Sequence, residues 1–243
     1  MSNHRPDRSM LMPGPIMTHR GHDDLRRLGA MKHSIDWLVF DLGGVVVDVQ
    51  PAEVTLDKLS RRSETPTQQL AELLRERFTE RPYSIAERFQ TGELNEAGFH
   101  AALNDSLGKP LEAATLTAEL ESMLRGESAE MVAFMQQLAR HHRLACYSNT
   151  NAVHWRYMQR HFRFFSVLER AFASQEIGFA KPDPQGFAHV AAALGAPAAA
   201  CMLIDDRQIN VDGAKAAGWQ ALHFEGIDRL REDFAALGVE AGT

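Results

Sequence analysis

Cysteine is scarce in this sequence, and a membrane-spanning run and a strong net charge are both missing. Only two cysteines, Cys146 and Cys201, occur among 243 residues, and each lies in an apolar segment. Two such residues do not make a disulfide framework, so we expect a reducing compartment, the cytoplasm. No apolar run approaches the roughly 20 residues that a membrane-spanning helix needs. The formal net charge of −6 gives no support for nucleic-acid binding, so we expect neither a membrane nor a nucleic acid as partner.

The first 32 residues also lack apolar periodicity. They contain several prolines, glycines and arginines but no continuous apolar stretch of the kind found in a secretory signal. We expect residues 1–32 to be a disordered extension. Met31 could be the true start, because the folded pattern begins directly after it.

The composition that remains is that of an ordinary globular protein. Hydrophobic residues make up 44% of the chain and charged residues 24%, so no fibrous or low-complexity class is indicated. The length suffices for one α/β domain, or for a core with a smaller inserted domain.

A short stretch near the start combines a buried strand with a carboxylate. Residues 37–40 are apolar and rich in branched and aromatic side chains, and Asp41 follows them, with Gly43 and Gly44 close behind. Burying a carboxylate is costly unless a nearby group needs its charge, and glycines allow another group to approach the backbone. Ligands of parallel α/β sheets bind where such strands end. We hypothesise that Asp41 is a nucleophile; an equally open alternative is that it caps the next turn.

Between Pro51 and Gly126 the apolar residues recur at helical spacings, and Asn95 is expected to cap one of these helices. The last of these amphipathic segments includes Leu116, Leu120, Met123 and Leu124, and no convincing strand is present in the region. A purely helical insertion within an α/β chain predicts a separate cap domain over residues 51–125.

Beyond Gly126 short apolar strands alternate with helices. The expected strands cover residues 144–147, 172–174, 201–204 and 220–224, and the expected helices cover residues 128–140, a segment ending near 162, a segment through 194, and 209–217. This alternation predicts a doubly wound, parallel α/β sheet of the Rossmann-like kind. We expect residues 33–50 and 126–243 to form this catalytic core.

Polar side chains follow several of these strands. They are Asp41, the run Ser148-Asn149-Thr150, Lys181 in a loop, and the pair Asp205-Asp206. Taken singly, the hydroxyls and the aspartates are explained as helix caps and the lysine as a surface residue. Strand ends of a doubly wound sheet converge on one crevice, however, and their joint occurrence points to a site.

The charges of this set indicate a cation. Three neighbouring carboxylates repel one another and stay ionised only beside positive charge, of which Lys181 supplies one unit. Oxygen ligands on short side chains suit Mg²⁺, which prefers carboxylates together with water and phosphate. Ser148 or Thr150, at a helix start, can cradle a phosphate. Together these groups predict phosphoryl transfer through an aspartyl-phosphate.

Four motifs, in this order, resemble those of haloacid dehalogenase (HAD) superfamily hydrolases. They are Phe40-Asp41-Leu42-Gly43-Gly44-Val45, Ser148-Asn149-Thr150, Lys181-Pro182-Asp183, and Ile204-Asp205-Asp206-Arg207-Gln208-Ile209-Asn210. The resemblance covers about residue 34 to the C-terminus. The Leu-Gly-Gly variant and the Ser-Asn-Thr-Asn motif resemble the bacterial α-D-glucose-1-phosphatase-like branch.

The resemblance implies a role for each matching residue. Asp41 would be the nucleophile and a metal ligand, and Ser148 and Lys181 would take part in catalysis as phosphate ligands, with Asn149 also in the substrate site. Asp206 and the Gly43 carbonyl would bind Mg²⁺, and Asp205 would join them or lie just behind. Asn210 could orient a metal-bound water. In the cap, the resemblance has Arg88 or Phe89 touching substrate, although Phe89 is better explained as part of the cap's own core.

Gly43 departs from the usual family pattern. Relatives mostly carry a second aspartate at this position as general acid and base, a contribution of about 10²–10⁴-fold in rate. Its absence predicts dependence on good leaving groups, such as aryl or anomeric sugar phosphates.

The sequence therefore predicts a Mg²⁺-dependent phosphatase, a monomer or homodimer, acting on a small phosphorylated metabolite such as a sugar phosphate. Two alternatives stay open. One is a phosphometabolite-binding protein that has lost turnover through Gly43. The other is a 2-haloacid dehalogenase, which needs no metal, so that the retained Asp205-Asp206 pair argues against it.

Overall fold

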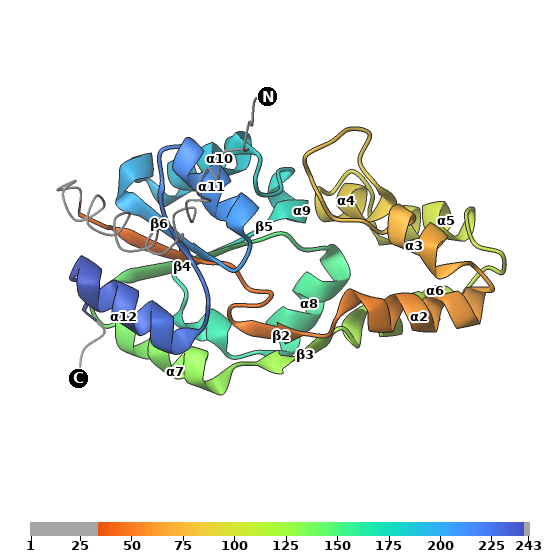
Figure 1. Cartoon of the computed structure of the whole chain (residues 1–243), viewed down its shortest axis with the longest axis horizontal. Helices are drawn as coiled ribbons and strands as arrows, with labels where there is room; N and C mark the ends of the chain where they lie inside the picture. Colours follow the sequence, from red (N-terminus) through yellow and green to blue (C-terminus); the bar gives the residue numbers. More distant parts are fainter. Residues whose placement is uncertain (1–33, 241–243) are drawn as a thin grey trace, which may run out of the picture. The chain divides into compact units, whose positions relative to one another are not determined.

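A parallel five-stranded sheet forms the centre of the protein (Figure 1). The computed structural model describes residues 34–240, so the predicted extension over 1–32 and the suggested start at Met31 lie outside the described residues. The strands are β1 (Trp37–Phe40), β4 (Arg143–Ser148), β5 (Arg170–Ala173), β6 (Cys201–Asp205) and β7 (Gln220–His223). Their order is β5-β4-β1-β6-β7, and every neighbouring pair is parallel. The predicted doubly wound α/β fold is confirmed.

The register of this sheet decides where Asp41 lies. Phe40 at the end of β1 is opposite Cys146 in β4 and Ile204 in β6. The backbone N–H of Asp41 then donates to the Ile204 carbonyl over 2.8 Å. Asp41 therefore leaves the sheet between the carboxyl ends of its two neighbours, where parallel sheets bind ligands.

Helices cover both faces of the sheet. In Figure 1, α10 (Pro184–Leu194) and α11 (Gln208–Ala216) lie on one side, and α7 (Ala129–Leu138) and α12 (Ile227–Leu237) on the other. Trp37 and Val39 pack in one core cluster with residues of α10 and α11. Leu38 and Phe40 are equally buried and, by the alternation of a strand, point to the opposite face. The sequence patterns had predicted all of these helices except α12.

A helical insertion separates β2 (Val47–Val49) from β3 (Leu124–Glu127). It contains α2 (Ala52–Ser63), α3 (Thr67–Leu73), α4 (Ile85–Gln90), α5 (Glu96–Asn104) and α6 (Ala113–Glu121). The predicted cap at Asn95 is confirmed, since its side chain accepts from the Gly98 N–H over 2.8 Å. These helices share an apolar cluster that includes Leu59, Phe89 and Phe99. Residues 51–125 as the limits of a separate domain stay a prediction.

The prediction that no strand lies between Pro51 and Gly126 was wrong, because β3 begins within this region. Helix α6 ends at Glu121, and Leu124, expected on the helix, begins β3 and pairs antiparallel with Val49 of β2. The Gln50 N–H also donates to the Met123 carbonyl over 2.8 Å. Three- and four-residue strands are too short to show an alternating pattern, and their pairing partners lie far apart in the sequence.

The remaining helices lie in the connections between strands of the sheet. They are α8 (Ala152–His161), α9 (Ser174–Ile177) and the 3₁₀ helices Phe164–Val167 and Ala198–Ala200. Along residues 34–240, every helix is too short or too polar to cross a membrane.

Candidate active site

Lys181 is the central charge of the site. It is 0% exposed, and its Nζ lies 2.6 Å from Asp205 Oδ2 and 3.0 Å from Asp41 Oδ1. Burial by itself would lower the pKa of Lys181, but the charges of Asp205 and Asp41 outweigh burial, so the net direction is upward. A protonated ammonium group is therefore fixed between two buried carboxylates.

Asn149 fixes the position of this lysine. The Lys181 backbone N–H donates to Asn149 Oδ1 over 2.7 Å, and Asn149 Nδ2 donates to the Lys181 carbonyl over 2.8 Å. This two-point contact ties the loop carrying Lys181 to the end of β4. The sequence placed Asn149 in the substrate site; the structure additionally shows that it positions Lys181.

Asp205 accepts several hydrogen bonds besides the lysine contact. The Arg207 N–H donates to Oδ1 over 2.9 Å, and Asn210 Nδ2 lies 3.0 and 3.1 Å from the two carboxylate oxygens. The negative charge of Asp205 is thus stabilised by the lysine and by hydrogen bonds within the protein. Asn210, suggested from sequence as a group that orients water, uses its amide nitrogen to hold Asp205.

Unlike Asp205, Asp206 has a buried carboxylate oxygen that the protein leaves without a hydrogen bond. This oxygen is Oδ1, and it is unusual because buried polar atoms are nearly always paired. Burial, followed by the charge of Asp205, raises the pKa of Asp206. Such an oxygen is stabilised by a positive group close to it.

Carboxylate oxygens of Asp41, Asp205 and Asp206 lie within 4.8 Å of one another. Three hard oxygen donors at this separation, one of them unpaired, fit a small divalent cation such as Mg²⁺. Asp41 and Asp206 would hold it most directly, because Asp205 is occupied by Lys181, Arg207 and Asn210. Gly43 lines the same pocket, and metal binding by its carbonyl stays a prediction.

The pKa of Asp41 is raised to about 7. Burial is the largest cause; Lys181 lowers the pKa and Asp205 raises it again. A cation bound beside Asp41 would favour the carboxylate form and so lower this pKa. The protonation state of the Asp41 carboxyl group is thus sensitive to metal and to pH near neutrality.

Gly44 supports the site in a way that the sequence did not reveal. Its φ is +79°, and a Cβ atom added there would lie 2.2 Å from Asp206 Oδ2. A side chain at this position would therefore displace the unpaired aspartate. The adjacent glycines were the available signal, but only the fold shows which residue approaches them.

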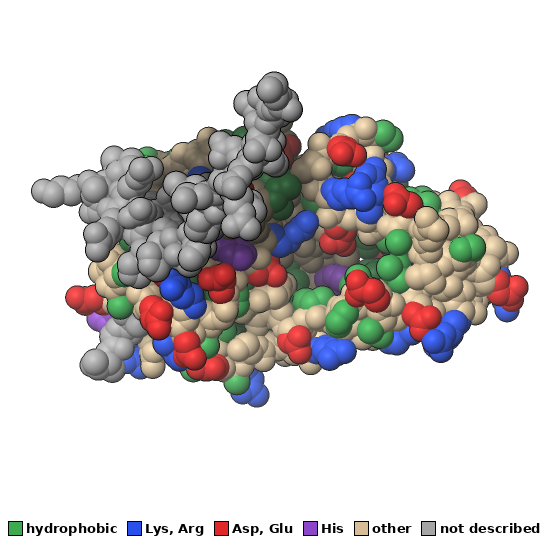
Figure 2. Space-filling view, viewed as in Figure 1, with side chains coloured by type: hydrophobic (Ala, Val, Ile, Leu, Met, Phe, Trp, Pro, Cys, Tyr) green, Lys and Arg blue, Asp and Glu red, His purple; other side chains and the backbone are tan. Residues whose placement is uncertain are grey.

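Most of the residues expected at the site come together. A cavity of about 180 Å³, which we call the catalytic pocket, is lined by Asp41, Gly43, Ser148, Asn149 and Asp206. Lys181 contacts Asp41 in this pocket, and Asp205 contacts Lys181. Arg88 is the exception: it pairs with Glu93 at 2.6 Å and lines a separate surface pocket with Tyr83. On the face shown in Figure 2, the molecule is hollowed between helix α2 and the loop before α4, with hydrophobic side chains visible inside.

Comparison with known proteins decides the family. Residues 35–218 match the family model of the haloacid dehalogenase-like hydrolases. The chain belongs to this family. Asp41, Lys181, Asp205 and Asp206 all lie within the matched range.

Named relatives of this HAD-like hydrolase are similar over limited segments. It is 36% identical over 78 residues to flavin mononucleotide hydrolase 1 of Arabidopsis thaliana, covering 32% of each chain. It is 34% identical over 77 residues to phosphatase MT3486 of Mycobacterium tuberculosis, covering 30% of this chain and 36% of that one. The chain thus aligns with about a third of the length of these curated relatives.

The fold is also that of a solved HAD family enzyme. The structure from Bacteroides thetaiotaomicron, in complex with magnesium and inorganic phosphate, has a TM-score of 0.67 and 22% identity, and covers 81% of this chain and 99% of that chain. The likeness to the glucose-1-phosphatase-like branch stays a prediction.

Proposed function

We propose that this HAD-like hydrolase is a Mg²⁺-dependent phosphatase that acts on a small phosphorylated metabolite through an aspartyl-phosphate at Asp41. One observation carries the proposal: the buried Lys181 ammonium joins Asp41 to Asp205, beside the unpaired oxygen of Asp206. A lysine and a cation-binding pair around a single aspartate are suited to an anionic, oxygen-rich substrate. The curated relatives, a flavin mononucleotide hydrolase and a phosphatase, support the same substrate class.

Each residue has a part in the two chemical steps. Asp41 attacks phosphorus, so an aspartyl O–P bond forms while the ester O–P bond breaks. Since Gly43 has no acidic side chain, the leaving oxygen takes its proton from water. A second water then attacks the aspartyl-phosphate, releasing phosphate and restoring the Asp41 carboxylate. Lys181 and the Ser148 hydroxyl bind the phosphate oxygens, and Mg²⁺, when bound, neutralises part of their charge.

Hydrolysis of p-nitrophenyl phosphate tests the proposal. We expect turnover with Mg²⁺ and its loss when EDTA removes the metal. Asp41→Asn should reduce kcat by more than about 10³-fold, as loss of a nucleophile does in other hydrolases. Asp48→Asn is the matched control, because Asp48 is an exposed aspartate only seven positions further on, and it should leave kcat unchanged. Turnover that survives Asp41→Asn would refute the mechanism.

Gly43 favours a second candidate, a protein that binds phosphometabolites without turning them over. The same groups would hold the phosphate, but the step that needs a proton donor would be too slow. Saturable binding of inorganic phosphate together with no p-nitrophenyl phosphate hydrolysis would support this candidate against the phosphatase.

A further inference from the structure

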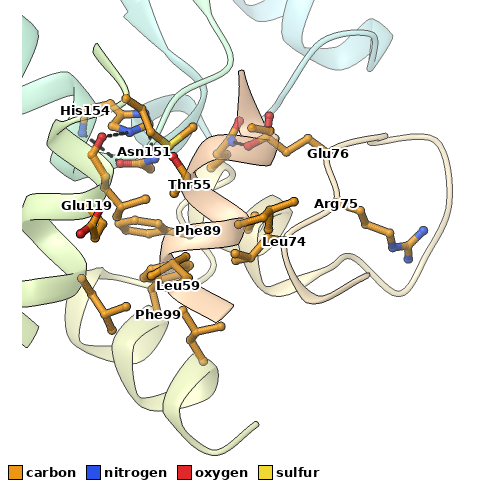
Figure 3. Close-up of a pocket in the computed structure, with 18 of the residues that line it drawn as sticks. Thr55, Leu59, Leu74, Arg75, Glu76, Phe89, Phe99, Glu119, Asn151 and His154 are labelled. Atoms are coloured by element: carbon orange, nitrogen blue, oxygen red, sulfur yellow. Dashed lines mark hydrogen bonds between the residues drawn. The ribbon is translucent and has the colours of Figure 1, made fainter. Parts of the chain in front are cut away.

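A second cavity lies within the helical insertion. Its volume is about 460 Å³, and its walls include Leu59, Leu74, Phe89, Phe99, Leu103 and Leu116. Figure 3 shows Leu59, Phe89 and Phe99 gathered in its middle, with Glu76, Asn151 and His154 toward one end and the Arg75 side chain directed away. We call this space the apolar cavity. Its size is within the range of small-molecule sites, about 300–1,000 Å³.

The apolar cavity and the catalytic pocket share part of their walls. Both are lined by Val49, Glu76, Gln90, Met123 and His154, and we call these five residues the neck. A molecule whose phosphate lies beside Asp41 would thus extend through the neck into the apolar cavity.

The neck histidine has no free hydrogen-bonding atom for a ligand. His154 Nε2 lies 3.0 Å from the Leu120 carbonyl, and Asn151 Nδ2 lies 3.2 Å from His154 Nδ1. Burial lowers the pKa of His154 to about 4, so the ring is neutral at physiological pH. It presents a ring face rather than a charge to the ligand.

Other polar groups on the wall are also engaged. Gln50 Nε2 donates to Thr55 Oγ1 over 2.7 Å. The Glu119 carboxylate pairs with Lys58 at 3.5 Å and with Arg62 at 3.2 Å. A ligand rich in hydroxyl groups would lose its water here and find few partners in return.

One buried acceptor in the neck has no hydrogen-bond partner. It is Gln90 Oε1, while Gln90 Nε2 donates to the Glu76 carboxylate. The unpaired oxygen lies where the phosphate-binding and apolar regions meet. It fits a ligand with a polar group close to its phosphate and an apolar body beyond.

From these features we infer that the substrate is a phosphate monoester with a bulky apolar leaving group, aromatic or branched, and that this group occupies the apolar cavity. The inference rests on the proposed phosphatase function and narrows it. It disfavours the sugar phosphate suggested by the sequence, because the cavity offers a sugar little compensation for lost hydration.

Matched esters test the inference. We expect kcat/KM for 1-naphthyl phosphate to exceed that for phenyl phosphate and for glucose 1-phosphate by at least tenfold. Leu59→Trp, which fills the apolar cavity, should reduce the naphthyl-to-phenyl ratio to below about threefold. Leu116→Phe fills less of the apolar cavity and should lower the same ratio if the tryptophan variant does not fold. Leu73→Trp is the control, because Leu73 packs against the same cluster but does not line the cavity, and it should keep the ratio.

Binding separates this inference from the phosphatase proposal. In Asp41→Asn with Mg²⁺, calorimetry should show 1-naphthyl phosphate binding at least tenfold more tightly than glucose 1-phosphate or inorganic phosphate. If the wild type hydrolyses no ester but this order of affinity holds, the phosphatase proposal fails and the occupant of the cavity is supported. Equal affinities, or a naphthyl-to-phenyl ratio that survives both filling variants, would overturn the inference.

Discussion

The catalytic pocket and the apolar cavity adjoin each other, but buried charges form the first and apolar side chains line the second. Lys181 and Asp205 in the first are both 0% exposed, and their charges are balanced by contacts at 2.6 and 3.0 Å. The second is walled by leucine and phenylalanine side chains, and the polar groups on its wall that we described, apart from Gln90 Oε1, bond to other groups of the protein. The catalytic pocket depends on the balance of charge, and the apolar cavity on the volume that its side chains leave open.

Their origin in the fold explains this difference. Asp41 and Asp205 lie at the ends of neighbouring strands whose register fixes them relative to each other. The cavity side chains come from helices α2 to α6 and from Leu74, the C-cap residue of α3. In the proposed function the sheet therefore positions the reacting groups and the helices contact the substrate, a division common among enzymes.

Removing the central charge should produce the largest effect in the catalytic pocket. Lys181→Met leaves Asp41 and Asp205 buried without their counter-ion. We expect the free energy of unfolding to fall by about 3–5 kcal/mol, measured by urea denaturation, together with loss of turnover.

A surface lysine provides the control for that change. Lys109 lies 4.0 Å from Glu64 with both side chains exposed, so Lys109→Met should change stability by less than about 1 kcal/mol. Asp205→Asn added to Lys181→Met should restore part of the loss. A Lys181→Met variant as stable as the wild type would show that the pocket does not depend on charge balance.

The next largest effect should come from Gly44→Ala. The new Cβ would lie 2.2 Å from Asp206 Oδ2, so the carboxylate that we propose to bind metal must move. We expect the Mg²⁺ concentration for half-maximal activity to rise by about 10–100-fold, as for other changes beside metal ligands. Gly178→Ala is the control: its φ of +82° imposes similar backbone strain, but nothing lies within 4 Å of the new Cβ. Equal Mg²⁺ requirements in the two variants would contradict this role of Gly44.

Gly43→Asp should add catalytic chemistry to the pocket. A Cβ there meets only Val49 Cγ2 at 3.5 Å, an ordinary contact, so the side chain fits. Since general acid catalysis contributes about 10²–10⁴-fold, we expect at least a tenfold gain in kcat for a simple alkyl phosphate and little change for p-nitrophenyl phosphate. A gain that is the same for both esters would show that the leaving group is not what limits the wild type.

The smallest effect should come from Arg88→Ala. The Arg88–Glu93 pair is partly exposed, and such pairs contribute about 0–1 kcal/mol. Because Arg88 lines a different pocket, kcat/KM for 1-naphthyl phosphate should change less than threefold, and Glu93→Ala should behave alike. A large increase in KM confined to Arg88→Ala would restore the sequence-based expectation that this arginine touches substrate.

Local sequence signals predicted most elements of the fold. The apolar run before Asp41 and the Asn95 cap are determined by neighbouring residues, and both predictions were confirmed. Strand β3 was missed because it exists through pairing with β2, from which the helical insertion separates it. The position of Arg88 was equally hidden, because a helix pattern does not say which way an exposed face turns within an insertion.

The sequence by itself determined that the acids and the hydroxyl lie close together, because each follows a recognisable strand, and parallel strands bring their carboxyl ends together. Only the tertiary structure decided that Asn149 holds Lys181, that Gly44 leaves room for Asp206, and that the helices enclose an apolar cavity. These features depend on distances of a few ångströms between residues far apart in the chain, and such distances are fixed by packing rather than by local pattern.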